Sequence, residues 1–330
     1  MALAAAHVPT SRSGSLRSLS VVIPCFNEEE VLHQLISRLG AVLAQIGIPT
    51  EIILVDDGSR DRTWSILTEF QALNPRLKAV KLSRNFGHQQ ALTCGLDHAQ
   101  GEAVVVLDAD LQDPPELIPE MIAKWHEGYD IVYAKRRHRE GETASKKLFA
   151  FAFYRVFRLI TGFSLPEDTG DCRLMDHRAL TAFRSMREPQ RFIRGMVSWV
   201  GFEQTAVMYD RPPRAAGTTK YPIRKSLMLA IDAITSFSYL PLRFASFMGM
   251  VVSAFSLLYI FVVFVKMALG KNLPGYTSLM AAVLFLGGVQ LLVLGILGEY
   301  VGRIYDQGKH RPLYLVDQIR GTPTLPSLDS

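Results

Sequence analysis

The stretch VVVLDADLQDPPE, Val104 to Glu116, decides the fold of this chain. It begins with four apolar residues, three of them β-branched, and such a run bounded by turn residues is typical of a strand buried on both faces of a parallel sheet. The acids Asp108, Asp110 and Asp113 follow, and the two prolines behind them favour a helix start. The sequence therefore predicts an α/β fold with these acids at the ligand-binding carboxyl edge of its sheet.

The same stretch predicts a divalent metal site. Asp108, Asp110 and Gln112 offer the hard oxygen ligands that suit Mg²⁺ or Mn²⁺, and such ions are often shared with substrate phosphates. A solvated acidic loop is the alternative, and for a bare Asp-x-Asp it would be the better interpretation. Here the buried strand, the second acid, the glutamine and the helix start agree, which favours the metal site.

Six motifs, in order along the chain, resemble inverting glycosyltransferases of family 2, in the branch that contains dolichyl-phosphate mannose synthase and bactoprenol glucosyltransferase. They read VVIPCFNEEE, ILVDDGSRDRT, LSRNFGHQQA, DADLQDPPE, TGDCRLMD and RAAGTTKY. With the apolar C-terminal part, the resemblance covers nearly everything after residue 17. It implies a GT-A-type, Rossmann-like domain that binds a nucleotide sugar.

Two earlier strand ends carry candidate donor ligands. Asn27 and Glu28 follow a strand that Pro24 breaks, and they could simply cap the next helix. The next strand delivers Asp56 and Asp57, whose carboxylates can accept hydrogen bonds from a base or a ribose. The resemblance implies nucleotide-sugar contacts for Pro24, Asn27, Glu28, Asp56, Asp57, Arg84 and Asp108. The chain has no G-x-G-x-x-G or Walker lysine motif, which argues against dinucleotide binding and ATP hydrolysis.

Basic residues predict a phosphate-bearing acceptor. Lysines and arginines cluster in residues 135–158 and again in RPPRAAGTTKY, and a membrane surface or a phosphate suits this charge better than nucleic acid does. Residues 146–160 form an amphipathic pattern, and a membrane interface and a helix packed on the sheet explain it equally well. The resemblance implies that the acceptor phosphate is bound by Arg136, Arg137, Arg214 and Lys220.

Asp171 in TGDCRLMD is, by resemblance, the acid nearest the reacting centre. A lipid phosphate monoester has a second pKa of about 6 and is already a competent nucleophile at neutral pH. Asp171 is therefore either a base or a residue that orients a substrate or the metal. The candidate catalytic residues are Asp171, Asp110 and Arg136. His88 is left out, because a lone histidine on a helix is more often structural.

Two long apolar runs follow the polar part of the chain. Residues 244–265 carry no charge over 22 positions and residues 272–298 none over 27, whereas about 20 helical residues cross a bilayer. The excess of Lys and Arg after the second run favours a cytoplasmic location for both polar ends. An amphipathic stretch, residues 227–237, precedes the first run and is expected in the membrane interface.

These patterns divide the chain into a disordered arm (1–16), a GT-A domain (17–225), an interfacial amphipathic helix (226–241), a two-span anchor (242–302) and a cytoplasmic tail (303–330). No signal peptide is expected. Together with the two apolar runs, this predicts a multi-pass protein of the bacterial inner membrane with its polar domain in the cytoplasm. Small residues in both spans would let helices approach closely, within one protomer or between protomers. The resemblance implies a homo-oligomer, with a tetramer as one form. The three cysteines are assigned no role.

The expected function is inverting transfer of a hexose from a UDP-sugar to undecaprenyl phosphate at the cytoplasmic membrane face. Glucose is the default by resemblance, since no residue distinguishes it from other sugars. A processive polysaccharide synthase is a poor alternative, because the Gln-x-x-Arg-Trp motif of such enzymes is replaced by PQRFIRGMVSW and only two spans are predicted. A non-catalytic scaffold that binds the lipid carrier is the other alternative, but it would have no reason to keep the metal ligands.

Overall fold

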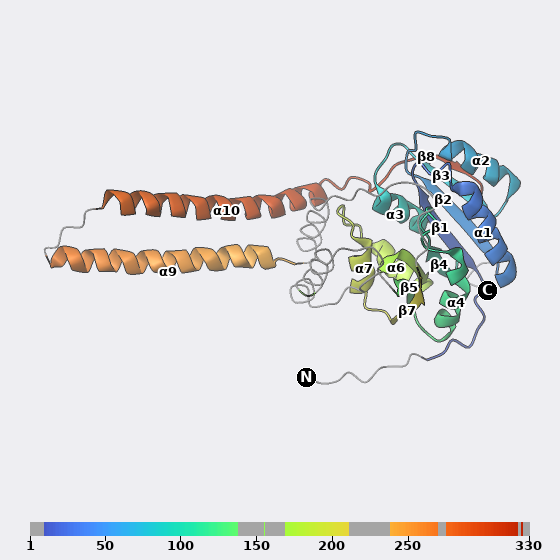
Figure 1. The fold of residues 1–330 in the computed structure, drawn as a ribbon, viewed down its shortest axis with the longest axis horizontal. Helices are drawn as coiled ribbons and strands as arrows, with labels where there is room; N and C mark the ends of the chain where they lie inside the picture. The colour runs from blue at the N-terminus through green and yellow to red at the C-terminus, as the bar shows by residue number, and fades with distance from the viewer. Residues whose placement is uncertain are drawn as a thin grey trace. The chain divides into compact units, whose positions relative to one another are not determined.

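The computed structural model describes residues 10–137, 155, 169–210, 238–269, 275–322 and 325. These residues belong to two compact units. The first contains the sheet and its helices, together with the end of the chain, and the second contains two long C-terminal helices. Figure 1 shows the elements with the labels used below.

The first unit is built on a mixed sheet with the strand order β7-β5-β6-β4-β1-β2-β3-β8 among the described residues. Four strands run parallel to one another: β1 (Leu19–Cys25), β2 (Thr50–Asp56), β3 (Leu77–Leu82) and β4 (Ala103–Val106). Strand β6 (Thr169–Asp176) is antiparallel to both β4 and β5 (Ile131–Arg136), and β7 (Gln204–Tyr209) is parallel to β5. The predicted α/β fold of GT-A type is confirmed.

Helices connect these strands: α1 (Leu32–Ile46), α2 (Thr63–Leu73), α3 (His88–His98), α4 (Ile118–His126), α6 (His177–Ser185) and α7 (Ile193–Trp199). A short 3₁₀ turn, η1 (Pro115–Leu117), precedes α4 and has the second proline of the acidic stretch at its first position. Asn27 and Glu28 do not cap helix α1, which begins at Leu32 with Val31 as its N-cap. Asn27 has a φ of 55°. That left-handed conformation cannot continue a right-handed helix.

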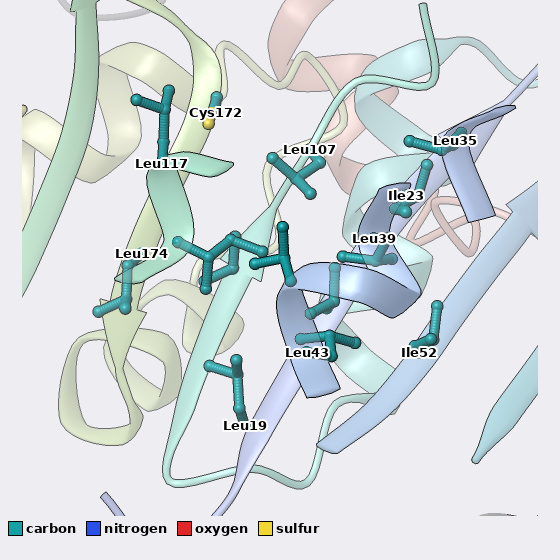
Figure 2. Close-up of a cluster of buried hydrophobic side chains, with 14 of the residues drawn as sticks. Leu19, Ile23, Leu35, Leu39, Leu43, Ile52, Leu107, Leu117, Cys172 and Leu174 are labelled. Atoms are coloured by element: carbon teal, nitrogen blue, oxygen red, sulfur yellow. The ribbon is translucent and has the colours of Figure 1, made fainter. Parts of the chain in front are cut away.

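The core lies between the sheet and the helices that cover it. Figure 2 shows Leu35, Leu39 and Leu43 of α1 near Leu19 and Ile23 of β1. Burying one such side chain contributes about 1.5–3 kcal/mol, so this face of α1 holds the helix on the sheet. The cysteines are buried and free.

The described part of the N-terminal arm is packed on the domain, although residues 1–16 were expected to be disordered. The first nine residues lie outside the described part. Arg12 donates to Asp130 Oδ1 and to Asp176 Oδ2, both at 2.7 Å, and its guanidinium lies 4.4 Å from the centre of the Trp125 ring. Arg12 holds the arm on the domain because it neutralises two nearly buried carboxylates, Asp130 and Asp176. Both lie more than 100 residues away in sequence, so the local sequence of the arm does not predict this contact.

Strand β8 (Val316–Arg320) lies in the stretch from residue 303 that the sequence predicts to be a cytoplasmic tail. It pairs antiparallel with β3. The backbone N–H of Ser83 donates to the carbonyl of Leu315 at 2.9 Å. This pairing satisfies the outer edge of β3. The strand reads VDQIR, which neither alternates apolar with polar residues nor forms an apolar run, so its sequence gives no strand signal.

The second unit consists of α9 (Leu240–Ala268) and α10 (Tyr276–Gly308), which run side by side in opposite directions. By length and composition, both helices could cross a membrane. Their large apolar side chains are exposed, among them Phe244, Phe255 and Leu291. A Cβ added to any of the glycines of α9 and α10 would meet no described atom within 4 Å, so these glycines do not form the contact between the two helices.

Several predicted features lie outside the described residues. They are the amphipathic stretch 146–160 apart from Arg155, the amphipathic stretch 227–237, and the acceptor candidates Arg214 and Lys220.

Candidate active site

The four parallel strands end at one edge of the sheet and deliver the predicted residues there. The turn after β1 carries Asn27, β2 ends in Asp56, the loop after β3 carries Arg84, and β4 leads to Asp108. This is the edge at which open α/β sheets bind ligands. The sheet therefore gathers the candidate donor ligands from four separate stretches of sequence.

Strand β6 brings Asp171 to the same edge from the opposite direction. In the antiparallel β4–β6 pair, Val106 is the partner of Arg173. If this register continues beyond the end of β4, Asp108, two residues after Val106, lies opposite Asp171, two residues before Arg173. Because side chains alternate in period two along a strand, both carboxylates emerge on one side.

Asp171 is surrounded by donors and is only 4% exposed. Its Oδ1 accepts from Arg194 Nε at 3.0 Å and from Arg173 Nη2 at 3.4 Å. Its Oδ2 lies 3.2 Å from His88 Nε2 and 3.5 Å from Gln89 Nε2. Burial by itself would raise the pKa of Asp171, but the two guanidinium groups and His88 more than offset it and hold this pKa well below its usual range. An ionised carboxylate of low pKa is a weak base and a strong electrostatic anchor.

Asp108 has the opposite environment. Its Oδ1 is buried without a hydrogen-bond partner in the described part of the chain, and lies 3.6 Å from His88 Nε2. Burial, followed by the negative charge of Asp171, raises the pKa of Asp108 to about 7. A metal cation beside this oxygen would favour the ionised form of Asp108 and so oppose the effects of burial and of the Asp171 charge.

The acidic loop therefore fits a hard divalent cation. Within the described residues, His88, Asp108 and Asp171 each offer one ligand atom, all within 4.8 Å of one another. The Asp171 oxygens already have hydrogen-bond partners, whereas the buried Asp108 Oδ1 accepts no hydrogen bond within the described residues and has an ion-pair contact of 3.6 Å with His88. This difference favours a cation on the side of Asp108, where Asp110 and Gln112 follow in sequence and the Gln112 N–H donates to Asp110 Oδ1 at 3.1 Å.

Asp57 supports the neighbouring loop. Its two oxygens accept from the backbone N–H groups of Phe86 at 2.7 Å and Gly87 at 2.9 Å. A Cβ on Gly58, which has a φ of 68°, would lie 2.6 Å from the backbone of Arg84, so only glycine allows the two loops to approach this closely. Asp57 thus holds in place the loop that carries the predicted pyrophosphate ligand Arg84.

The other donor candidates join the β1 and β2 turns. Asn27 Oδ1 accepts from the N–H of Arg60 at 2.9 Å, and the N–H of Glu28 donates to Thr63 Oγ1 at 2.9 Å. Asp56 is fully buried, accepts from the Ser59 N–H at 3.1 Å, and has a second oxygen without a partner in the described residues. Pro24 lies within β1. The hydrogen bonds of Asn27 and Glu28 therefore join the turn after β1 to the turn after β2.

The predicted acceptor ligands Arg136 and Arg137 lie at the end of strand β5 and directly after it. Arg136 Nε donates to the hydroxyl of Tyr209 at 3.4 Å, and Tyr209 in turn donates to Asp113 Oδ1. Arg137 is exposed and lies 3.8 Å from Asp210.

Sequence reasoning missed His88, Arg194 and Tyr209 as members of this site. His88 contacts an acid 83 residues away, a proximity that no local spacing reveals. The only available signal for His88 was its place in the LSRNFGHQQA motif.

Comparisons with known proteins find two matching families and several relatives along most of the chain. The family described as Glycosyl transferase family 2 matches residues 20–183, and the family described as GtrB C-terminal hairpin matches residues 240–304. The uncharacterized glycosyltransferase YkcC of Bacillus subtilis is 50% identical over 92% of this chain and 94% of its own. The bactoprenol glucosyl transferase of Shigella phage SfV is 40% identical over 90% of this chain and 97% of its own. A crystal structure of mannosyl-3-phosphoglycerate synthase from Rubrobacter xylanophilus has a TM-score of 0.49 at 19% identity, and the match covers 66% of this chain and 72% of that one.

Proposed function

Because the chain belongs to glycosyl transferase family 2, we propose that this glycosyltransferase moves a hexose, by default glucose, from a UDP-sugar to undecaprenyl phosphate with inversion. The observation that carries the proposal is the pairing of Asp108 and Asp171 at the ligand edge of the sheet, in a chain with two helices that could cross a membrane. The acceptor is supported by similarity to a bactoprenol glucosyl transferase along nearly its whole length.

On the donor side, Asp108, Asp110 and Gln112 hold the divalent ion. A bound Mg²⁺ or Mn²⁺ would neutralise the charge that develops on the pyrophosphate as the donor bond breaks. The turns that carry Asn27 and Asp57 bind the nucleoside, and Arg84 adds a positive charge for the pyrophosphate.

On the acceptor side, an oxygen of the lipid phosphate forms a bond to the anomeric carbon. The bond from that carbon to the pyrophosphate oxygen breaks at the same time, and UDP leaves with the electron pair. Arg136 and Arg137 bind the attacking phosphate, and so do Arg214 and Lys220. Asp171 orients this centre rather than removing a proton, because its low pKa makes it a weak base and the phosphate is already ionised.

The two long helices anchor the enzyme where its acceptor resides. The proposed domain boundaries lie at residues 225, 241 and 302, and strand β8 belongs to the catalytic domain because it extends that sheet. Reporter fusions after residues 240 and 320 are expected to report the cytoplasm, and one near Pro274 the other side. Opposite reports from the two outer fusions would show that one helix does not span. Cross-linking in membranes tests the proposed homo-oligomer.

The proposed reaction is tested with purified protein, labelled UDP-hexoses and undecaprenyl phosphate in Mg²⁺. We expect one labelled hexose per lipid in the organic phase, with the anomeric configuration opposite to that of the donor by NMR. Products that lengthen with time would favour a processive synthase. Binding of the lipid without turnover of any donor would favour the scaffold. An Asp108→Asn variant that still binds lipid but makes no product controls for contaminating activity.

A further inference from the structure

A chain of hydrogen bonds connects the acidic loop with the arginine of β5. The hydroxyl of Tyr209 donates to Asp113 Oδ1, and Arg136 Nε donates to the same hydroxyl at 3.4 Å. Asp113 is 1% exposed and Tyr209 is 5% exposed, whereas Arg136 is partly exposed. The hydrogen bonds therefore lead from a buried carboxylate to a guanidinium that ligands can approach.

The direction of these bonds is fixed by chemistry. A guanidinium only donates, a carboxylate accepts, and a phenol has a single proton. Burial, together with the charge of Asp113, raises the pKa of Tyr209, so the phenol keeps its proton. It can therefore donate to Asp113 and present its lone pairs to Arg136.

The backbone places these groups with little freedom. Arg136 and Tyr209 are direct partners in the parallel β5–β7 register, and the N–H of Arg137 donates to the carbonyl of Tyr209 at 2.9 Å. A Cβ on Gly170 would lie 2.9 Å from Asp113 Oδ2 and 3.5 Å from Arg136 Nη2. Arg136 is thus held next to the start of β6, one residue before Asp171.

We propose that Tyr209 is a positioning residue: it holds the Arg136 guanidinium in the orientation that binds the acceptor phosphate. Asp113 is the buried anchor of Tyr209. This inference rests on the proposed function, in which Arg136 binds that phosphate. An arginine side chain that is already oriented loses less rotamer freedom when it binds a ligand. Tyr209 should therefore strengthen acceptor binding and leave donor binding unchanged.

A double-mutant cycle of Tyr209→Phe and Arg136→Ala tests this link. With undecaprenyl phosphate as the varied substrate, Tyr209→Phe is expected to raise the acceptor KM by about 3- to 10-fold, the usual value of one hydrogen bond. In the Arg136→Ala background the same change should alter KM by less than about 2-fold, because the partner is absent. UDP affinity in Mn²⁺, measured by calorimetry, should match the wild type. An equal effect in both backgrounds, or a loss confined to UDP affinity, overturns the inference.

A second variant covers the case in which Tyr209→Phe fails to fold because Asp113 loses its donor. Arg136→Lys retains the positive charge but lacks the Nε–H that the phenol accepts, so a similar rise in acceptor KM is expected. If Arg136→Ala raises the acceptor KM but Arg136→Lys has the wild-type KM, the role of Tyr209 is overturned and the proposed function is not. An unchanged KM in Arg136→Ala removes Arg136 from acceptor binding and overturns that part of the proposed function as well.

Discussion

Asp108 and Asp171 lie opposite each other at the end of the antiparallel β4–β6 pair, and a ligand atom of each is within 4.8 Å of the other and of His88 Nε2. Their environments differ, because two arginines balance the charge of Asp171, while the buried Asp108 Oδ1 accepts no hydrogen bond within the described residues and faces His88 at 3.6 Å. One acid is therefore an electrostatic anchor, and the other is available to a cation.

Removal of divalent ions should abolish turnover. We expect no product in EDTA and full recovery in Mg²⁺ or Mn²⁺, because the acidic loop would otherwise meet the pyrophosphate with unbalanced negative charge. Asp110→Asn should weaken Mn²⁺ binding, measured by electron paramagnetic resonance, while Asp317→Asn on the exposed strand β8 should not. Full turnover in chelator would contradict the metal assignment. A nitrogen coupling to Mn²⁺ that disappears in His88→Gln would place His88 among the ligands instead.

Asp171→Asn should lower kcat by about 10²-fold, the cost of misplacing reacting groups by about 1 Å, and leave UDP binding almost intact. The pKa of Asp171 is held well below its usual range, so this acid stays ionised throughout pH 6–9. Raising the pH across that range completes the ionisation of the lipid phosphate and of Asp108, whose pKa is raised to about 7, but leaves the charge of Asp171 unchanged. We therefore expect a constant deficit from pH 6 to 9.

The competing base role makes a different prediction for the same variant. If Asp171 only deprotonates the phosphate, the rate should recover toward the wild type as the pH rises. Thermal unfolding serves as the control, because removal of the Asp171 charge leaves buried Arg173 short of a counter-charge.

Arg12→Ala should destabilise the catalytic domain by about 2–3 kcal/mol, since it leaves the nearly buried Asp130 and Asp176 without their cation. Arg17→Ala is the matched control. Its side chain is 45% exposed and lies 3.7 Å from Glu102, and such surface pairs contribute at most about 1 kcal/mol. Equal midpoints of thermal unfolding for the two variants would show that the arm does not stabilise the domain.

Gly58→Ala should reduce both stability and UDP affinity. The added Cβ would lie 2.6 Å from the backbone of Arg84 and Asn85, at a φ of 68°, and a strained backbone position costs about 1–3 kcal/mol. Gly40→Ala, within helix α1 and with nothing within 4 Å of its added Cβ, should be neutral or stabilising by up to about 1 kcal/mol. Calorimetry with UDP compares the two, and an undiminished affinity in Gly58→Ala would show that the loop contact is dispensable.

Local patterns in the sequence were sufficient for the class of fold and for the position of the acidic loop. The apolar run before Asp108 predicts β4, and the proline pair predicts the start of the next helix, because these signals depend on neighbouring residues. The two charge-free runs likewise predict the long helices α9 and α10. The six ordered motifs led to the family that the comparisons confirm.

Tertiary structure decided which residues meet. Asp171 reaches Asp108 only because β6 enters the sheet antiparallel to β4, and His88 reaches both from the start of another helix. The resemblance assigns Asp57 to the nucleotide, and the fold shows in addition that its carboxylate holds the next loop. Sheet order and register depend on how distant segments bury their apolar faces together, and no local pattern encodes this. The sequence therefore predicts individual strands, turns and candidate ligands, whereas the packing of the sheet decides which charged side chains meet at the site.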